Sequence, residues 1–316
     1  MRHDIRTTGG TRLAILHTEA PADTWSEARW DEVRGHVREL LGSYGVVMLR
    51  GAGVRDTAAF HASVSGFGRD LIQSYRGGNT PRTTLSEGVF TSTEYPARYD
   101  ITLHNELSYA AKWPERLYFC CLDAPDTGGA TPVCDGEALL GALSPEVRDR
   151  FASGVVYHQY LHGGAGLGKS WQDTFETTDK EAVGEFLTAS AAEFEWTGDG
   201  GLRVRQHRPG TVKNPRTGRD TWFNQADQWH PSNLPDDEGE LLLSITESVA
   251  DLPHWVTYAD GTPLSDADLA EVRAAQDAHK LIEPWQRGDV MIVDNHSVLH
   301  GRQAFTGTRK VVVSMT

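Results

Sequence analysis

The sequence predicts a mainly β fold with flanking helices, in the α+β class, on three observations. Short apolar runs of strand length recur from residue 46 to residue 314, helical spacing is confined to a few separate stretches, and strands do not alternate with helices as in a doubly wound sheet. The chain has 316 residues, a length at which such folds often form one unit. We therefore expect one domain over residues 1–316, with a helical and loop insertion at about 163–196.

The N-terminal part predicts a helix that covers a sheet. Apolar residues recur there at helical spacing, namely Trp30, Val33, Val37, Leu40 and Leu41. Gly45 supplies a stop, and the run VVMLR at 46–50 is typical of a buried strand.

The middle and C-terminal parts predict further strands separated by two helical stretches. The continuous apolar run at 117–122, the turn at 125–129 and the short strand at 131–134 indicate consecutive strands of a β core. After the insertion, which is rich in glycine and then helical around 179–193, we expect strands at 202–212, 221–224, 289–294 and 309–314, and helices at 236–249 and 265–280.

Composition narrows the class of protein. A formal net charge of −14 argues against a nucleic-acid surface, because neutralising phosphates requires a basic face. No run approaches the roughly 18 apolar residues of a membrane span, and the N-terminus lacks an apolar signal core, so we expect a soluble, cytoplasmic chain with no membrane partner. The three cysteines, Cys120, Cys121 and Cys134, are too few for a disulfide framework and are expected to be reduced core residues.

Three residues have the chemistry of an iron site. His104 and Glu106 are two positions apart, so on an extended backbone both side chains point to the same face. One imidazole, one carboxylate and a distant second imidazole form the facial triad of non-haem Fe(II) oxygenases, which leaves positions open for cosubstrate and oxygen. His300, in the segment DNHSVLHGR at 294–302, supplies the second imidazole. His296 shares its face on a regular strand and is the competing ligand.

An arginine that could bind a carboxylate follows His300 in the sequence. Arg309 lies nine residues beyond His300, where its guanidinium is able to pair with a carboxylate that reaches in from the metal. A dicarboxylate such as 2-oxoglutarate needs a chelated keto acid end and a distal cation with a hydroxyl. Thr131, just after Gly128 and Gly129, is the candidate for that hydroxyl.

In this order, these motifs resemble the taurine dioxygenase/TfdA superfamily of Fe(II)/2-oxoglutarate enzymes along nearly the whole chain. The segments that resemble its syringomycin-type hydroxylase branch, which is clavaminate-synthase-like, are PRT at 81–83, FTSTEYP at 90–96, HNELSY at 104–109, GKSWQ at 168–172, WFNQ at 222–225 and WQRGD at 285–289. The branch is known from peptide antibiotic pathways and is similar to amino-acid hydroxylases that also use Glu as a ligand.

The resemblance implies a double-stranded β-helix, a distorted jelly roll with flanking helices. It implies Fe(II) on His104, Glu106 and His300, 2-oxoglutarate on Thr131 and Arg309, and O2 as the oxidant. The implied substrate is a small molecule, such as an amino acid, free or tethered to a carrier protein, that is hydroxylated or otherwise oxidised at a C–H bond in a biosynthetic pathway. No second arginine follows Arg309, so an extra carboxylate-binding arginine of some relatives is absent. Oligomeric state is left open.

Substrate contacts are expected from residues near these motifs rather than from the iron ligands. The candidates are Arg82, Asn105, Tyr109, Trp222 and Asn224. Packing or loop capping is the competing role for each of them.

Two other functions compete with the oxygenase. The segment GGAGLGKS at 163–170 fits the P-loop pattern, and VMIVD at 290–294 resembles a Walker B strand, which suggests a nucleotide-hydrolysing enzyme. A P-loop, however, must join a buried parallel strand to a helix, and the residues on either side of 163–170 suit neither element well. The second alternative is a catalytically silent jelly-roll binding protein, against which the intact triad argues.

Overall fold

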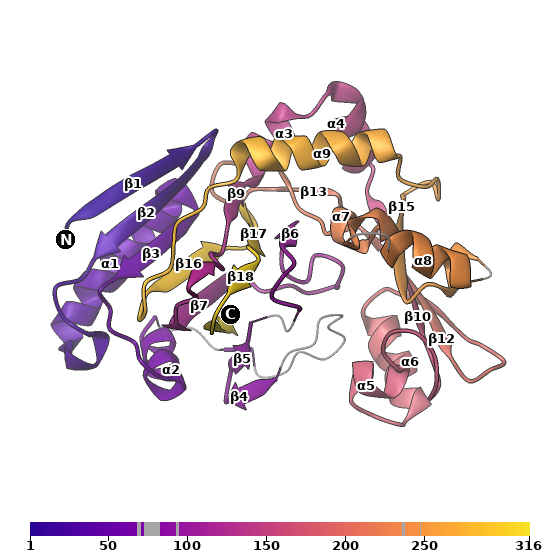
Figure 1. Ribbon diagram of the computed structural model, residues 1–316, viewed down its shortest axis with the longest axis horizontal. Helices are drawn as coiled ribbons and strands as arrows, with labels where there is room; N and C mark the ends of the chain where they lie inside the picture. Colours follow the sequence, from indigo (N-terminus) through magenta and orange to yellow (C-terminus); the bar gives the residue numbers. More distant parts are fainter. Residues whose placement is uncertain (68–70, 73–82, 93–94, 236–237, 247) are drawn as a thin grey trace.

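The computed structural model describes residues 1–67, 71–72, 83–92, 95–235, 238–246 and 248–316 (Figure 1). Its largest sheet has eight strands in the described residues, in the order β1-β2-β3-β16-β7-β19-β5-β4. In that order the strands are His3–Thr8, Thr11–His17, Val46–Arg50, Val290–Asp294, Arg116–Asp123, Lys310–Met315, Val89–Thr91 and Thr84–Ser86.

A three-stranded sheet lies in the middle of the molecule, between the large sheet and a four-stranded sheet (Figure 1). It has the order β6-β17-β9, with strands Ile101–His104, Val298–Arg302 and Val133–Asp135. The four-stranded sheet β11-β12-β10-β15 has strands Glu193–Trp196, Leu202–Arg208, Val155–Leu161 and His254–Tyr258. Two strand pairs complete the β structure: β13 (Thr211–Lys213) with β14 (Asp220–Trp222), and β18 (Phe305–Thr306) with β8 (Thr127–Gly128).

Helices flank these sheets (Figure 1). The α-helices α1 to α9 are Glu27–Tyr44, Thr57–Ser65, Gly136–Ala142, Pro145–Ala152, Trp171–Phe175, Lys180–Ala189, Ala226–Trp229, Glu238–Ile245 and Asp266–His279. Short 3-10 helices span Ala22–Thr24, Pro231–Asn233 and Val249–Asp251. Of the described helices, none is long and apolar enough to span a membrane.

The sequence of the central strand β7 is continuously apolar because both faces of the strand are buried. Successive side chains of a strand point to opposite faces. Leu117, Phe119 and Cys121 enter one core cluster, whereas Tyr118, Cys120 and Leu122 enter the other. The second cluster is covered by α1, which Ser26 caps and which ends at Gly45 with φ of 73°. The first contains residues of β9 and β17, so the large sheet packs against the sheet that holds His300.

Most predicted elements are confirmed, within a few residues at their ends. The helix before Gly45, the strand at 46–50, the strand at 117–122 and the helix at 265–280 correspond to α1, β3, β7 and α9. The strand expected from Thr131 begins later, at Val133. All three cysteines are buried and free, as expected, and burial raises the thiol pKa of Cys121 and Cys134 to about 12.

Candidate active site

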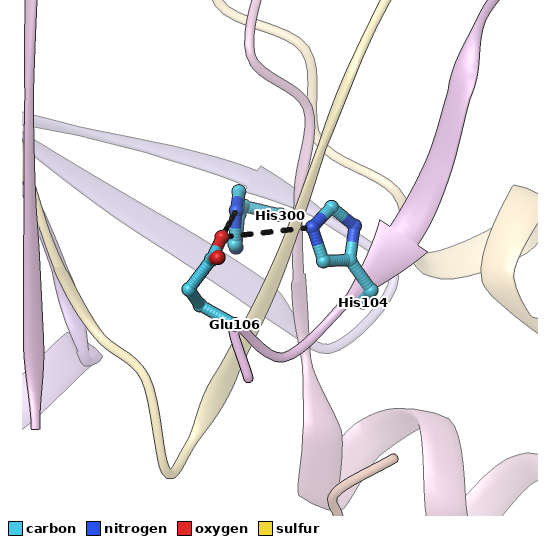
Figure 2. A group of neighbouring side chains, drawn as sticks. All are labelled: His104, Glu106 and His300. Atoms are coloured by element: carbon cyan, nitrogen blue, oxygen red, sulfur yellow. Dashed lines mark ion pairs between the residues drawn. The ribbon is translucent and has the colours of Figure 1, made fainter. Parts of the chain in front are cut away.

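Strand pairing brings His104 and His300 directly opposite each other on β6 and β17. Their ring centroids lie 4.3 Å apart. An oxygen of the Glu106 carboxylate lies 3.9 Å from Nε2 of His104 and 3.6 Å from Nε2 of His300, and the three side chains point toward one another (Figure 2). One ligand-type atom from each residue falls within 4.8 Å of the others, and all three residues are buried.

The expected extended backbone through Glu106 is wrong. Strand β6 ends at His104, and Glu106 belongs to the turn that follows, where Leu107 has a φ of 55°. The fully buried Asn295 holds this turn: its Oδ1 accepts from the Glu106 N–H at 2.8 Å, and its Nδ2 donates to the Glu106 carbonyl at 3.0 Å. A side chain just beyond the end of β16 thus places the carboxylate beside the two imidazoles.

The orientation of His104 suits a metal ligand. Its Nδ1 lies 2.9 Å from the Thr102 carbonyl, which only accepts, so the tautomer with the proton on Nδ1 makes this hydrogen bond and leaves the Nε2 lone pair directed at Glu106. The Gln228 amide lies 3.0 Å from the same Nδ1. Metal–ligand bonds of roughly 2.0–2.2 Å allow donor atoms up to about 4 Å apart to share one ion. Two imidazoles and one carboxylate in this arrangement therefore fit a divalent iron.

His296, the competing ligand, is engaged elsewhere. Its Nε2 accepts from Nε1 of Trp113 at 2.9 Å, and its ring stacks with Phe223 at a centroid distance of 5.8 Å. It is not part of the group formed by His104, Glu106 and His300. These contacts account for His296 as a packing residue beside the turn.

A small pocket connects the two histidines with both residues expected to hold 2-oxoglutarate. It is lined by Ser92, Ile101, His104, Phe119, Thr131, His300, Gly301, Arg302 and Arg309. The Thr131 hydroxyl accepts from Nε1 of Trp285 at 3.2 Å. Arg309 donates from Nε to the Gly129 carbonyl at 2.7 Å and from Nη1 to the Ser92 hydroxyl at 3.2 Å.

The charge of Arg309 is uncompensated within the described part of the chain, where no carboxylate forms an ion pair with it. Burial, with a further contribution from Arg302, lowers the pKa of Arg309 to about 10, which still leaves it charged at neutral pH. Gly129 permits its close approach, because a Cβ at that residue would lie 3.1 Å from Cδ of Arg309. A partly buried cation in a pocket that two histidines also line suits a ligand with a carboxylate at each end.

The neighbouring cation, Arg302, has a structural role. Its two terminal nitrogens donate to the carbonyls of Tyr95, Pro96 and Tyr99 at 2.7–2.8 Å. It therefore fixes the 95–99 segment against β17. The terminal nitrogens of Arg302 therefore already have three carbonyl acceptors, whereas Arg309 donates to only one backbone carbonyl, that of Gly129.

The residues expected to contact substrate are dispersed. Arg82 lies outside the described residues. Asn105 is fully buried and donates to the Asn295 carbonyl at 2.8 Å. Trp222 packs on Phe151, and Asn224 donates to the Gly210 carbonyl at 2.8 Å. Packing and loop hydrogen bonds thus account for these three.

Tyr109 is the exception among them, because it lines a larger groove next to the site. That groove is lined by Ile72, Leu107, Tyr109, Ala110, Ala111, Lys112, Trp113, Pro114, Gln159, Phe175, Phe186, Leu187, Ala189, Ser190 and Gln206. Its wall begins at Leu107, the residue after Glu106.

The P-loop alternative finds no support. The segment 163–170 follows β10, which pairs antiparallel with both β12 and β15. The helix after it, α5, has only five residues. The strand that resembles Walker B, β16, is also antiparallel to both of its neighbours. Neither a parallel strand nor a phosphate-binding helix is therefore present at these segments.

Three site residues were missed from the sequence: Ser92, Asn295 and Gln228. Ser92 and Asn295 lie inside segments that carry the family resemblance, 90–96 and 294–302, but no local pattern gives them a role. Gln228 reaches His104 from α7, more than a hundred residues away along the chain. Only the folded arrangement reveals these contacts.

Comparisons with known proteins agree with the geometry. The model of the family described as "Taurine catabolism dioxygenase TauD, TfdA family" matches residues 11–316. The chain is 33% identical over 303 residues to the dapdiamide synthesis protein DdaC of Enterobacter agglomerans, covering 95% of this chain and 91% of that protein. It is 29% identical over 292 residues to a clavaminate synthase-like protein of Arabidopsis thaliana, covering 89% and 84%.

Similarity to a solved structure supports the same fold. The structure of PvcB, described as an Fe, alpha-ketoglutarate dependent oxygenase from an isonitrile synthetic pathway, has a TM-score of 0.54 at 14% identity and covers 99% of this chain and 90% of its own. Together with the two facing sheets, this confirms the expected jelly-roll architecture with flanking helices.

Proposed function

The chain belongs to the TauD, TfdA family of dioxygenases, and on that premise we propose that it oxidises a C–H bond of an amino acid, free or carrier-tethered, with iron on His104, Glu106 and His300. As a family member it is a non-haem Fe(II)/2-oxoglutarate-dependent dioxygenase that acts on a small molecule in a biosynthetic pathway. The observation that carries the site assignment is the shared pocket, which joins two members of the triad to Thr131 and Arg309.

The triad holds the metal. Nε2 of each histidine and the Glu106 carboxylate face one point, the Asn295 side chain fixes the Glu106 backbone, and the Thr102 carbonyl fixes the His104 ring. Bound Fe(II), with 2-oxoglutarate and O2, supplies the oxidising chemistry. The three buried side chains would hold the ion and leave its other positions for cosubstrate and oxygen.

Arg309 and Thr131 hold the cosubstrate at the other end of the pocket. Arg309 supplies the positive charge for the distal carboxylate, and Ser92 positions the guanidinium through its hydroxyl. The Thr131 O–H is able to donate to the same carboxylate, because its oxygen already accepts from Trp285. Elements from residue 92 to residue 309 line this pocket, which supports residues 1–316 acting as one catalytic unit.

Relatives that are named for biosynthesis, such as the dapdiamide synthesis protein, support the substrate class. An aerobic screen of amino acids, their amides and carrier-bound forms tests the proposal by following succinate and product mass together. We expect one succinate per oxidised product, with a mass gain of one oxygen or a loss of two hydrogens. Succinate formation that no member of the panel stimulates would contradict the substrate class, whereas no succinate under any condition would contradict the site assignment.

A further inference from the structure

The groove that begins at Leu107 is separate from the pocket that holds Arg309. It has a volume of about 430 Å³, within the roughly 300–1,000 Å³ typical of small-molecule sites. One wall is the chain segment 107–114, which leads directly from Glu106, and the other is formed by helices α5 and α6. We refer to it as the 107–114 groove. Its wall starts one residue after Glu106, so one end of the groove is on the same chain segment as a proposed iron ligand.

Two buried amides line this groove, whose other lining residues are mainly apolar, with Lys112 and Ser190 as polar exceptions. On β10, Tyr157, Gln159 and Leu161 alternate with outward-facing residues, so Gln159 lies on the inner face of the sheet, where Tyr157 and Leu161 belong to core clusters. Gln159 pairs with Val204 of β12, which places Gln206 diagonally across from it. Both glutamines have an exposed fraction of 7% and line the groove.

Gln159 lacks a hydrogen-bond partner at Nε2 within the described residues. A buried amide left unpaired costs on the order of 1–3 kcal/mol, so native proteins rarely bury one without a use. Gln206 differs, since its Oε1 accepts from Nη2 of Arg208 at 2.8 Å. The unpaired Nε2 of Gln159 is itself covered in the empty groove, so a ligand acceptor would satisfy it after a small shift of this side chain.

Apart from Lys112 and Ser190, the remaining walls of the groove are mainly apolar. Phe175 and Phe186 pack edge to face at a centroid distance of 5.6 Å, and Leu187 follows on α6. Leu107 and Tyr109 supply the opposite wall near Glu106. An acceptor held by Gln159 would thus be flanked by apolar surface on both sides.

We propose that the 107–114 groove binds a substrate with an amide-type carbonyl, which Gln159 recognises, joined to an apolar arm that lies against Phe175 and Phe186. This rests on the proposed function, and it narrows the substrate from any amino acid to an acylated or amide-linked small molecule. The held arm would orient the reacting C–H bond toward the triad.

Two probes of matched chain length test the proposal on the full chain: N-hexylacetamide and ethyl hexyl ether, which lacks the carbonyl and keeps only a weaker acceptor, titrated by ligand-observed NMR. Wild type should bind the amide more tightly. Gln159→Leu should weaken the amide roughly fivefold through the lost hydrogen bond, and should leave ether binding unchanged or tighter. Phe186→Ala should weaken both probes by roughly tenfold, through lost apolar burial.

Phe194→Ala is the matched control, because Phe194 packs in the same cluster from β11 but does not line the groove. It should bind both probes as wild type does. The proposal is overturned if wild type binds neither probe, if Gln159→Leu changes both affinities by the same factor, or if Phe186→Ala has no larger effect than Phe194→Ala. Probe binding requires neither iron nor oxygen, so a failure here is distinguishable from a failure of the proposed catalytic site.

Discussion

Replacement of Arg309 by alanine should weaken 2-oxoglutarate far more than substrate. Arg309 sits in a pocket with two proposed iron ligands, makes its own hydrogen bonds to Gly129 and Ser92, and pairs with no carboxylate in the described residues. Truncating one partner of a buried charge-assisted pair costs about 3–5 kcal/mol, which corresponds to a hundredfold or greater loss of affinity. A solvent-exposed arginine would cost under about 1 kcal/mol.

The assay is an anaerobic titration of the Fe(II)-loaded chain with 2-oxoglutarate. Arg309→Lys should recover only part of the loss, because an ammonium keeps the charge without the planar two-point contact. Lys310→Ala is the matched control: Lys310 is the next residue, is exposed on β19, and should bind 2-oxoglutarate as wild type does.

A dissociation constant for Arg309→Ala within roughly threefold of wild type, under about 1 kcal/mol, would refute this reasoning. The distal carboxylate would then be held elsewhere. Arg302 would be the next candidate, because it lines the same pocket, although its terminal nitrogens already donate to three backbone carbonyls.

Three further predictions follow from named contacts. Asn295→Ala removes the hydrogen bonds that hold the Glu106 turn, so it should destabilise the chain by about 2–3 kcal/mol in urea unfolding and weaken Fe(II) binding. Lys169→Ala should leave 2-oxoglutarate turnover largely intact, and ATP hydrolysis that disappears in this variant would revive the nucleotide alternative. Burial lowers the His158 pKa to about 4, below the roughly 6.5 of the unfolded chain, so its contribution is present above pH 6.5 and is lost as pH falls toward 4. His158→Phe should therefore lose less stability than wild type between about pH 7 and pH 5, by on the order of 1 kcal/mol for this partly exposed ring, measured by denaturant unfolding at both pH values.

The sequence predicted those helices and strands that depend only on neighbouring residues. The apolar run of β7 is buried on both faces, and the helix ending at Gly45 needs only its own periodicity and a left-handed cap. The hairpin of β1 and β2, with Gly9 and Gly10 between the strands, was not predicted, although a Gly-Gly pair between strands is a turn signal.

The candidate site required long-range information. The two-residue spacing of His104 and Glu106 suggested a shared face, yet Glu106 lies beyond the strand in a turn that Asn295 holds. Arg309 lies nine residues beyond His300, yet it directly precedes β19 of the large sheet, whereas His300 lies in the three-stranded sheet. The residues meet because two sheets face each other, and sheet pairing cannot be deduced from sequence spacing alone.

Anaerobic measurement of Fe(II) bound per chain tests the central assignment most directly, in wild type, His104→Ala, Glu106→Ala, His300→Ala and the control His296→Ala. We predict tight binding of one iron by wild type and by His296→Ala, whose imidazole contacts Trp113 instead of the triad. Each of the other three variants should lose most of its affinity. Unchanged affinity in those three variants, or loss in His296→Ala with retention in His300→Ala, would contradict the assignment.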